Sequence, residues 1–123
     1  MKAKSLGARF AQALADKDRA RIIDLLDPAV DFRGVTPQRF WEASDPQALV
    51  ADVLWQWFED SDEIEALEKV ETDAFADRER VGYRFRVRNP EGRFLVEQQL
   101  YIAAEAGRIS WMRAVCSGFR PLG

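Results

Sequence analysis

The sequence predicts a single α+β domain in which three helices pack against one face of a curved antiparallel sheet. Apolar residues recur at helical spacing in the first half of the chain and alternate at strand spacing in the second half. The last third contains two strands of roughly twice the usual length of about 5–6 residues. Long antiparallel strands twist and bend. The sheet should therefore be concave, with helices burying their apolar stripes against it.

Length and composition fit one globular domain spanning residues 1–123. The chain is 47% hydrophobic and 32% charged, which excludes a disordered protein. Its net charge is −3, with the two signs interspersed and without the basic stripe of a nucleic-acid-binding protein. No apolar run approaches the ~18 residues of a membrane-spanning helix. We expect neither a nucleic-acid partner nor a membrane partner.

The sequence contains no histidine and one cysteine, Cys116. These counts exclude Ser-His and Cys-His nucleophile pairs, histidine-ligated metals and an intramolecular disulfide. We expect no cofactor. Cys116 has no basic neighbour in sequence, which favours a buried thiol over a nucleophile. Arg9 and Gln12 interrupt the apolar run of a secretory signal, and we expect a cytoplasmic protein.

Capping residues and apolar spacing predict three helices. Residues 5–15 carry the first, and Asp18 is a suitable N-cap for a second over residues 19–26, which Pro28 follows. A third begins at Pro46, directly after a cap residue. Its apolar stripe favours a role in the core over a cofactor-binding role: Leu49, Val50, Val53, Leu54, Trp57 and Phe58.

The strands are predicted from alternation. Short strands are expected at residues 30–34 and 39–42, and residues 64–75 favour a strand over a helix. Residues 81–88 alternate cleanly, with an arginine-rich face that should be solvated. Residues 93–119 hold the two long strands, joined by a turn at residues 105–107. Residues 64–119 therefore predict a four-stranded meander.

Three segments, residues 10–18, 25–32 and 107–115, resemble the nuclear transport factor 2-like superfamily, particularly its SnoaL-like and ketosteroid-isomerase-like branches. They match a helical hairpin leading into the first strand and the last strand of the sheet. The resemblance implies a cone, a cystatin-like α+β barrel, with a pocket at its open end. Members of the superfamily include isomerases, polyketide cyclases, dehydratases, epoxide hydrolases and non-catalytic binding or dimerisation modules.

The resemblance does not carry over the catalytic residues of the steroid isomerases. The position of their aspartate base matches Gly34, and the tyrosine and protonated aspartate of their oxyanion hole match Phe10 and Gln99. Phe10 offers no donor and Gly34 no base. The dehydratase branch relies on histidine, and no inward Asp-Arg-Asp set of the epoxide hydrolases is evident. Isomerase activity of that kind is not expected.

With the register that the resemblance implies, Glu97, Gln99 and Tyr101 point into the cone. Glu97 is the candidate general base for proton transfer beside a carbonyl, with Gln99 and Tyr101 as orienting donors. The alternative is a solvated Glu97 or one paired with an arginine. The expected guest is a flat, hydrophobic, oxygen-bearing small molecule. The other expected ligand-binding residues are Phe10, Phe32, Trp41, Trp55, Tyr83, Phe85, Met112 and Cys116, with Trp41 and Trp55 as lid residues.

The opposite face of the same strands should be apolar, because Val96, Leu100, Ile102, Trp111 and Val115 would lie on it. Monomers seldom expose so large a patch, and we expect a homodimer formed through the convex face. A one-residue slip would reverse the whole assignment. Two functions remain open: a SnoaL-like pocket protein with cyclase or isomerase activity, and a non-catalytic ligand-binding or dimerisation module.

Overall fold

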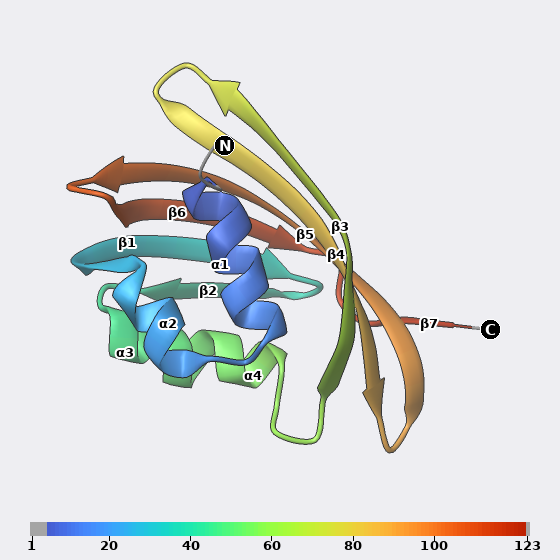
Figure 1. Ribbon diagram of the computed structural model, residues 1–123. Coiled ribbons are helices and arrows are strands. Elements are labelled where there is room, and N and C mark those ends of the chain that lie inside the picture. The colour runs from blue at the N-terminus through green and yellow to red at the C-terminus, as the bar shows by residue number, and fades with distance from the viewer. Residues whose placement is uncertain (1–4, 123) are drawn as a thin grey trace.

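The computed structural model describes residues 5–122 and shows a curved sheet whose hollow holds the helices (Figure 1). Residues 1–4 and 123 of the expected domain lie outside the description. The strand order is β2-β1-β6-β5-β4-β3, with β7 beside β5. The helical elements are α1 (Leu6–Ala15), α2 (Arg19–Asp24), α3 (Pro46–Ala48), a π-helix (Leu49–Leu54) and α4 (Trp55–Trp57). The strands are β1 (Leu26–Thr36), β2 (Arg39–Ala43), β3 (Glu63–Phe75), β4 (Arg78–Asn89), β5 (Gly92–Glu105), β6 (Arg108–Cys116) and β7 (Arg120–Pro121).

The predicted helix starts are confirmed by their caps. The Asp18 side chain accepts the Arg21 N–H at 3.1 Å, and the Asp45 side chain accepts the Ala48 N–H at 2.8 Å. The second helix ends two residues earlier than expected, because Leu26 already belongs to β1. The third is continuous but wider in the middle, where the turns are those of a π-helix. Its predicted apolar stripe is buried throughout.

The predicted α+β architecture and the meander of β3 to β6 are confirmed. The sheet is mixed, not wholly antiparallel, because β1 runs parallel to β6. β1 is also longer than the expected segment 30–34, and its pairing with β6 is interrupted between Leu26 and Asp31. α2 ends at Asp24 and β1 begins at Leu26, so a single residue joins the helices to the sheet. Figure 1 shows α1 and α2 lying in the hollow of the sheet.

The expected orientation of β5 is wrong, and the reversed alternative holds. Val96, Leu100 and Ile102 are buried on the concave side, whereas Glu97 and Gln99 are exposed on the convex side. Paired residues of neighbouring strands share a face, and β4 aligns Val96 with a buried partner, Phe85. On β6 the inward orientation of Met112, Ala114 and Cys116 is confirmed, as is the inward set of β4: Val81, Tyr83, Phe85 and Val87.

Helix α1 is fixed to β4 at a point that only glycine fits. The Gly7 N–H donates to the Glu79 carboxylate at 2.9 Å, which satisfies one of the free donors of the first turn. A Cβ at residue 7 would lie 2.3 Å from Glu79 Oε1 and 2.8 Å from Val81 Cβ. Any side chain there forces the helix away from the strand.

We therefore expect Gly7→Ala to lower the free energy of unfolding by about 1–3 kcal/mol through overpacking, although alanine is the better helix former. Urea denaturation measures this. Gly82→Ala is the matched control, because a Cβ at residue 82 would meet only the Gln98 carbonyl oxygen, at 4.0 Å. Equal stability of the two variants would contradict the close packing of α1 on β4.

Candidate functional site

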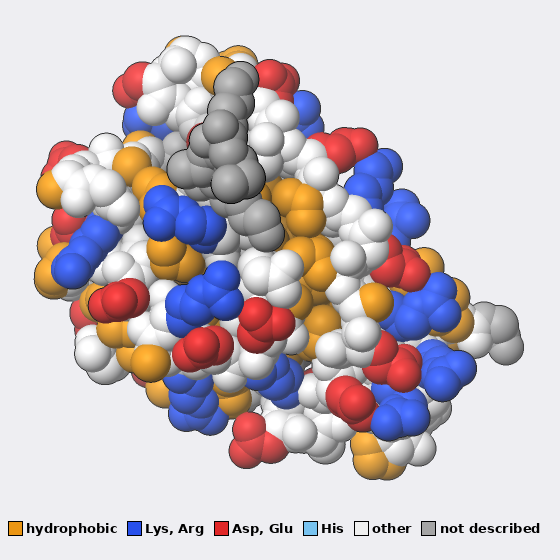
Figure 2. All heavy atoms as spheres, viewed as in Figure 1, with side chains coloured by type: hydrophobic (Ala, Val, Ile, Leu, Met, Phe, Trp, Pro, Cys, Tyr) orange, Lys and Arg blue, Asp and Glu red, His pale blue; other side chains and the backbone are white. Residues whose placement is uncertain are grey.

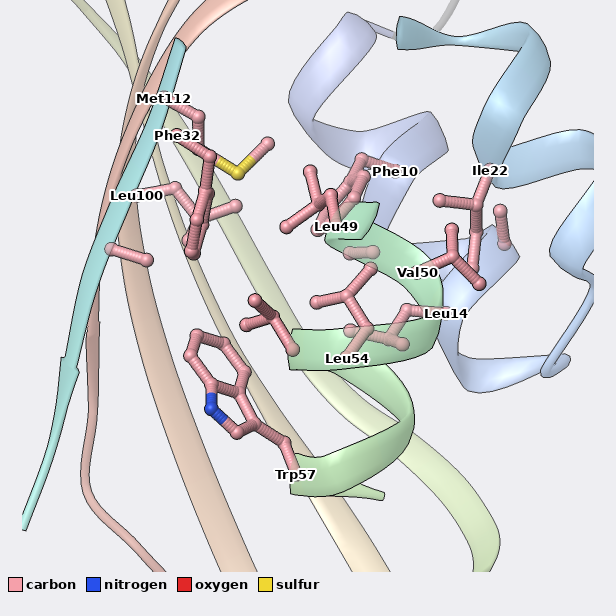
Figure 3. Close-up of a cluster of buried hydrophobic side chains, with 14 of the residues drawn as sticks. Phe10, Leu14, Ile22, Phe32, Leu49, Val50, Leu54, Trp57, Leu100 and Met112 are labelled. Atoms are coloured by element: carbon pink, nitrogen blue, oxygen red, sulfur yellow. The ribbon is translucent and has the colours of Figure 1, made fainter. Parts of the chain in front are cut away.

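The space between the curved sheet and the helices is filled by side chains (Figure 3). They come from α1, from the helical segment of residues 46–57 and from strands β1, β4, β5 and β6. The largest fully buried ones are less than 2% exposed. A ligand would have to displace side chains to enter. The largest members of this core are Phe10, Phe32, Phe58, Phe85, Leu100 and Met112.

Most of the expected pocket residues lie together in this interior: Phe10, Phe32, Tyr83, Phe85, Met112 and Cys116. The two expected lid residues separate. Trp41 is half-buried on the edge strand β2 and lies edge-on against Trp57, with ring centroids 6.1 Å apart. Trp55 instead packs against α2, where Arg19 Cζ lies 4.6 Å from the centroid of the Trp55 ring. Trp41 is the lid candidate that remains.

Glu97, Gln99 and Tyr101 lie on the convex face and not in the pocket. Glu97 accepts from Arg84 Nε at 2.8 Å and from Arg84 Nη2 at 2.5 Å, so the predicted alternative of an arginine pair holds. The Gln99 amide donates to the Tyr101 hydroxyl at 3.4 Å. Glu97 therefore cannot act as a base inside the cone.

A buried polar chain crosses the interior instead. The Tyr83 hydroxyl donates to Gln98 Oε1 at 2.5 Å, and the Gln98 amide donates to Cys116 Sγ at 3.3 Å. Burial, and secondarily Cys116, raises the pKa of Tyr83 well above 10, so its hydroxyl remains protonated at neutral pH. Sequence reasoning missed Gln98, because a glutamine flanked by polar residues resembles a solvated position.

Few polar side chains face the interior within residues 5–122. The buried charged or amide side chains among the described residues are Asp62 and Gln98. Asp62 is engaged by the Glu59 N–H and the Asn89 amide, both at 2.9 Å. Gln98 does not titrate, and Tyr83 is a weaker acid than usual. The buried carboxylate of the described residues is thus the Asp62 group, and both of its oxygens already accept hydrogen bonds from the protein.

One polar atom of the interior has no partner. Trp57 is 6% exposed, and its indole nitrogen forms no hydrogen bond within residues 5–122. The ring lies between Phe32, at a centroid distance of 5.9 Å, and Trp41. This buried donor has hydrogen-bonding capacity that the fold leaves unused.

The convex face carries an apolar hollow of about 250 Å³. Val35, Phe40 and Val115, which line it, are 44%, 58% and 59% exposed. Tyr101 and two arginines, Arg33 and Arg113, also line it. The predicted outward position of Val115 is confirmed. The expected Val96, Leu100 and Ile102 of β5 are buried, and Val35 of β1 and Phe40 of β2 lie beside Tyr101 in their place.

A charged basin of about 300 Å³ lies beside this hollow, over Gly82. Gly82 has no side chain to fill the basin, and charged side chains of both signs surround it. The basin includes Arg84 and Glu97, which pair with each other, and Lys69 and Glu71, whose charged atoms are 3.2 Å apart. Charges of both signs also alternate over the helix-covered face shown in Figure 2.

No group of three or more acidic or cysteine side chains within residues 5–122 is arranged to hold a metal ion. None of the helices in this part of the chain has both the length and the apolar character that crossing a membrane requires.

Solved structures share this arrangement over almost the whole chain. A candidate isomerase of Rhodopseudomonas palustris superposes with a TM-score of 0.76 at 18% identity, covering 95% of this chain and 93% of its own. A candidate polyketide cyclase of Pseudomonas putida has a TM-score of 0.71 at 12% identity, covering 93% and 90%. A protein of Catenulispora acidiphila with a ketosteroid isomerase-like fold, in complex with trimethylamine, has a TM-score of 0.68 at 9% identity, covering 94% and 88%.

The chain has the cone fold of the nuclear transport factor 2-like superfamily. The predicted resemblance is thus confirmed at the level of the fold. No family model matches the sequence, and no curated protein matches it. Since this fold supports many unrelated activities, the function must be argued from the residues of this chain.

Proposed function

We propose that this chain is a homodimeric, non-catalytic module whose two copies join through the convex faces of their sheets. The observation that carries the proposal is the apolar hollow on that face, lined by Val35, Phe40, Tyr101 and Val115. Scattered exposed apolar residues are normal, but residues gathered in one hollow are typical of an interaction surface. Cys116 is buried and free, which suits a reducing compartment, so we place the dimer in the cytoplasm.

A second copy is the partner that suits the charges around the hollow. In a two-fold dimer the same patch meets itself. The neighbouring basin carries both signs, with Lys69 and Arg84 beside Glu71 and Glu97, so a rotated copy can set opposite charges against each other. A stable interface buries about 800 Å² on each side, and the hollow and basin together provide a continuous face for it.

The interior argues against proton-transfer catalysis of the isomerase type. Phe10 and Gly34 stand where a donor and a base would be needed, and Glu97 lies outside. The buried Tyr83 and Gln98 bond to each other, Gln98 also bonds to the Cys116 thiol, and within residues 5–122 neither of them bonds to a carboxylate or a cationic side chain. The cyclase or isomerase alternative therefore finds no support in the residues that face the interior.

Val115→Glu tests the dimer. Val115 lines both the hollow and the basin. A carboxylate there must be desolvated on association, and we expect the dissociation constant to rise at least about 100-fold, or about 2.7 kcal/mol. Sedimentation equilibrium measures it against the 14.1 kDa mass of one chain.

Val70→Glu is the matched control. Val70 is 39% exposed, but it pairs with the inward Tyr83 and so lies on the other face of the sheet. It should leave the dimer intact. A wild-type chain that sediments at 14.1 kDa at micromolar concentration would overturn the proposal.

Binding of a small hydrophobic molecule within the cone is a second candidate function, favoured by the unpartnered N–H of Trp57. Small-molecule sites are mostly apolar, with few polar groups that orient the ligand. The aromatic interior provides such a setting once a side chain moves. Titration of the wild-type chain with a flat apolar ketone tests this function, and absence of binding would remove it.

A further inference from the structure

The indole N–H of Trp57 is a buried hydrogen-bond donor that the fold leaves unpaired. Buried polar groups are nearly always bonded in native proteins, and each exception calls for an explanation such as a water or a ligand. Figure 3 shows the nitrogen on the edge of the ring that faces the sheet, within the cluster that contains Phe32 and Leu100. An acceptor placed there would satisfy the donor.

The surroundings of Trp57 define what kind of molecule could supply that acceptor. The Phe32 ring is tilted by 58° against Trp57, and the Trp41 ring stands at 86° to it. Gly34 brings backbone close to the same rings, since a Cβ there would lie 3.2 Å from Trp57 Cη2 and 2.8 Å from Phe32 Cζ. Aromatic walls and one neutral donor suit a flat, uncharged molecule with a single oxygen acceptor.

Trp41 covers this place from the solvent side. It is half-buried on β2, a five-residue strand at the edge of the sheet, and it pairs with Gly34 of β1. Its own indole N–H donates to Thr36 Oγ1 at 2.8 Å, and the Arg39 guanidinium stacks 3.6 Å from its ring centroid. Both contacts come from the hairpin that carries Trp41. Turning the ring outward therefore breaks one side-chain hydrogen bond and the edge-on contact with Trp57, but no backbone pairing.

We propose that Trp57 donates its indole N–H to the oxygen of a flat, neutral, apolar ligand, and that Trp41 is the lid that turns away to admit it. This rests on the second candidate function, ligand binding within the cone, and adds the donor and the entry route. Thr36 acts as the latch, because its hydroxyl holds the Trp41 ring in the closed position. Arg39 lies at the rim and stays in solvent.

Thr36→Val tests the lid. Valine keeps the shape of threonine but cannot accept from the Trp41 N–H, so the closed position becomes less favourable and the ligand binds more easily. The probe is prodan, a flat naphthalene ketone whose emission shifts to shorter wavelength in apolar surroundings. We expect Thr36→Val to bind it about 3- to 10-fold more tightly than the wild type, the size of one lost hydrogen bond.

Thr72→Val is the matched control for the lid, because Thr72 is exposed on β3, at the opposite edge of the sheet. It should bind prodan as the wild type does. If the wild type and Thr36→Val bound prodan with equal affinity, the proposal that Trp41 is a lid held by Thr36 would be wrong.

The donor is tested by placing benzothienylalanine at residue 57 in the Thr36→Val chain. Sulfur then replaces the N–H while the shape of the ring stays. We expect prodan affinity to fall about 10-fold, and the urea midpoint without ligand to stay the same or rise, because an unpaired buried donor is removed. The same replacement at Trp111, which lies outside the interior beside Arg113, is the control and should change neither value.

The outcomes separate the two levels of the proposal. No binding of prodan by any of the chains overturns the ligand-binding function and this inference with it. Binding that is indifferent to Thr36→Val and to the loss of the Trp57 N–H leaves ligand binding in place and overturns the lid and the donor.

Discussion

Replacing Leu100 with alanine should lower the free energy of unfolding by about 2–5 kcal/mol. Leu100 is 1% exposed and lies between Val81 of β4 and Ala114 of β6, both buried. Truncation to alanine leaves a cavity in the buried core, where Figure 3 shows Leu100 near Phe32 and Met112. Rigid neighbours on three elements limit how far the site can collapse.

The measurement is urea denaturation in a Val115→Glu background, so that dimerisation does not add to stability. Gln99→Ala is the control, because Gln99 precedes Leu100 but points outward into solvent. Its effect should stay within about 0.5 kcal/mol. If Gln99→Ala proved the more damaging of the two, the orientation of β5 described above would be wrong.

The sequence predicts the inward and outward faces of β4 correctly but not those of β5, the strand that carries Gln99 and Leu100. On β4 the sequence separates its faces cleanly, with Val81, Tyr83 and Phe85 inward and arginines between them. Pattern and structure agree there because only one of the two faces can be buried without burying charge.

On β5 the pattern is ambiguous. Apolar residues occupy both faces, since Leu95 and Tyr101 alternate with Val96 and Leu100. The polar residue that is buried, Gln98, finds its partners 15 and 18 residues away along the chain. Local alternation cannot show such partners, so the orientation of β5 was not decided by the sequence.

The helices were predictable for a similar physical reason. Apolar stripes and cap residues are local signals. The stripe alone located the first helix, and cap residues located the starts of the other two at Asp18 and Asp45. The candidate site was only partly predictable. Trp41 and Phe32 follow from apolar alternation, but the importance of Trp57 depends on what its nitrogen fails to contact, which is a property of the packed interior.

Tyr83 should make the protein lose stability in alkali. Burial raises its pKa in the folded chain well above 10, with Cys116 as the second cause, whereas the unfolded chain keeps a value of about 10. Below pH 10 both states hold the proton, and the pKa difference has no effect. Above pH 10 the unfolded state releases the proton and the folded state does not, so the unfolded state gains stability with rising pH.

The expected loss is about 1.4 kcal/mol for each pH unit above 10, until the pKa of the folded state is reached. Urea midpoints between pH 9 and pH 11.5 measure it. Tyr83→Phe should be less stable at neutral pH, because Gln98 Oε1 loses its donor, but it should lack this component of the alkaline slope.

Tyr101→Phe is the control, since Tyr101 is the other tyrosine and lies partly exposed on the convex face. It should keep the wild-type slope, because the replacement leaves the buried hydrogen bond between Tyr83 and Gln98 in place. The lysines and arginines are the same residues in all three chains, so the comparison isolates the tyrosines. An identical slope in Tyr83→Phe and the wild type would mean that Tyr83 ionises as easily inside the fold as in water, which is incompatible with the buried hydrogen bond to Gln98.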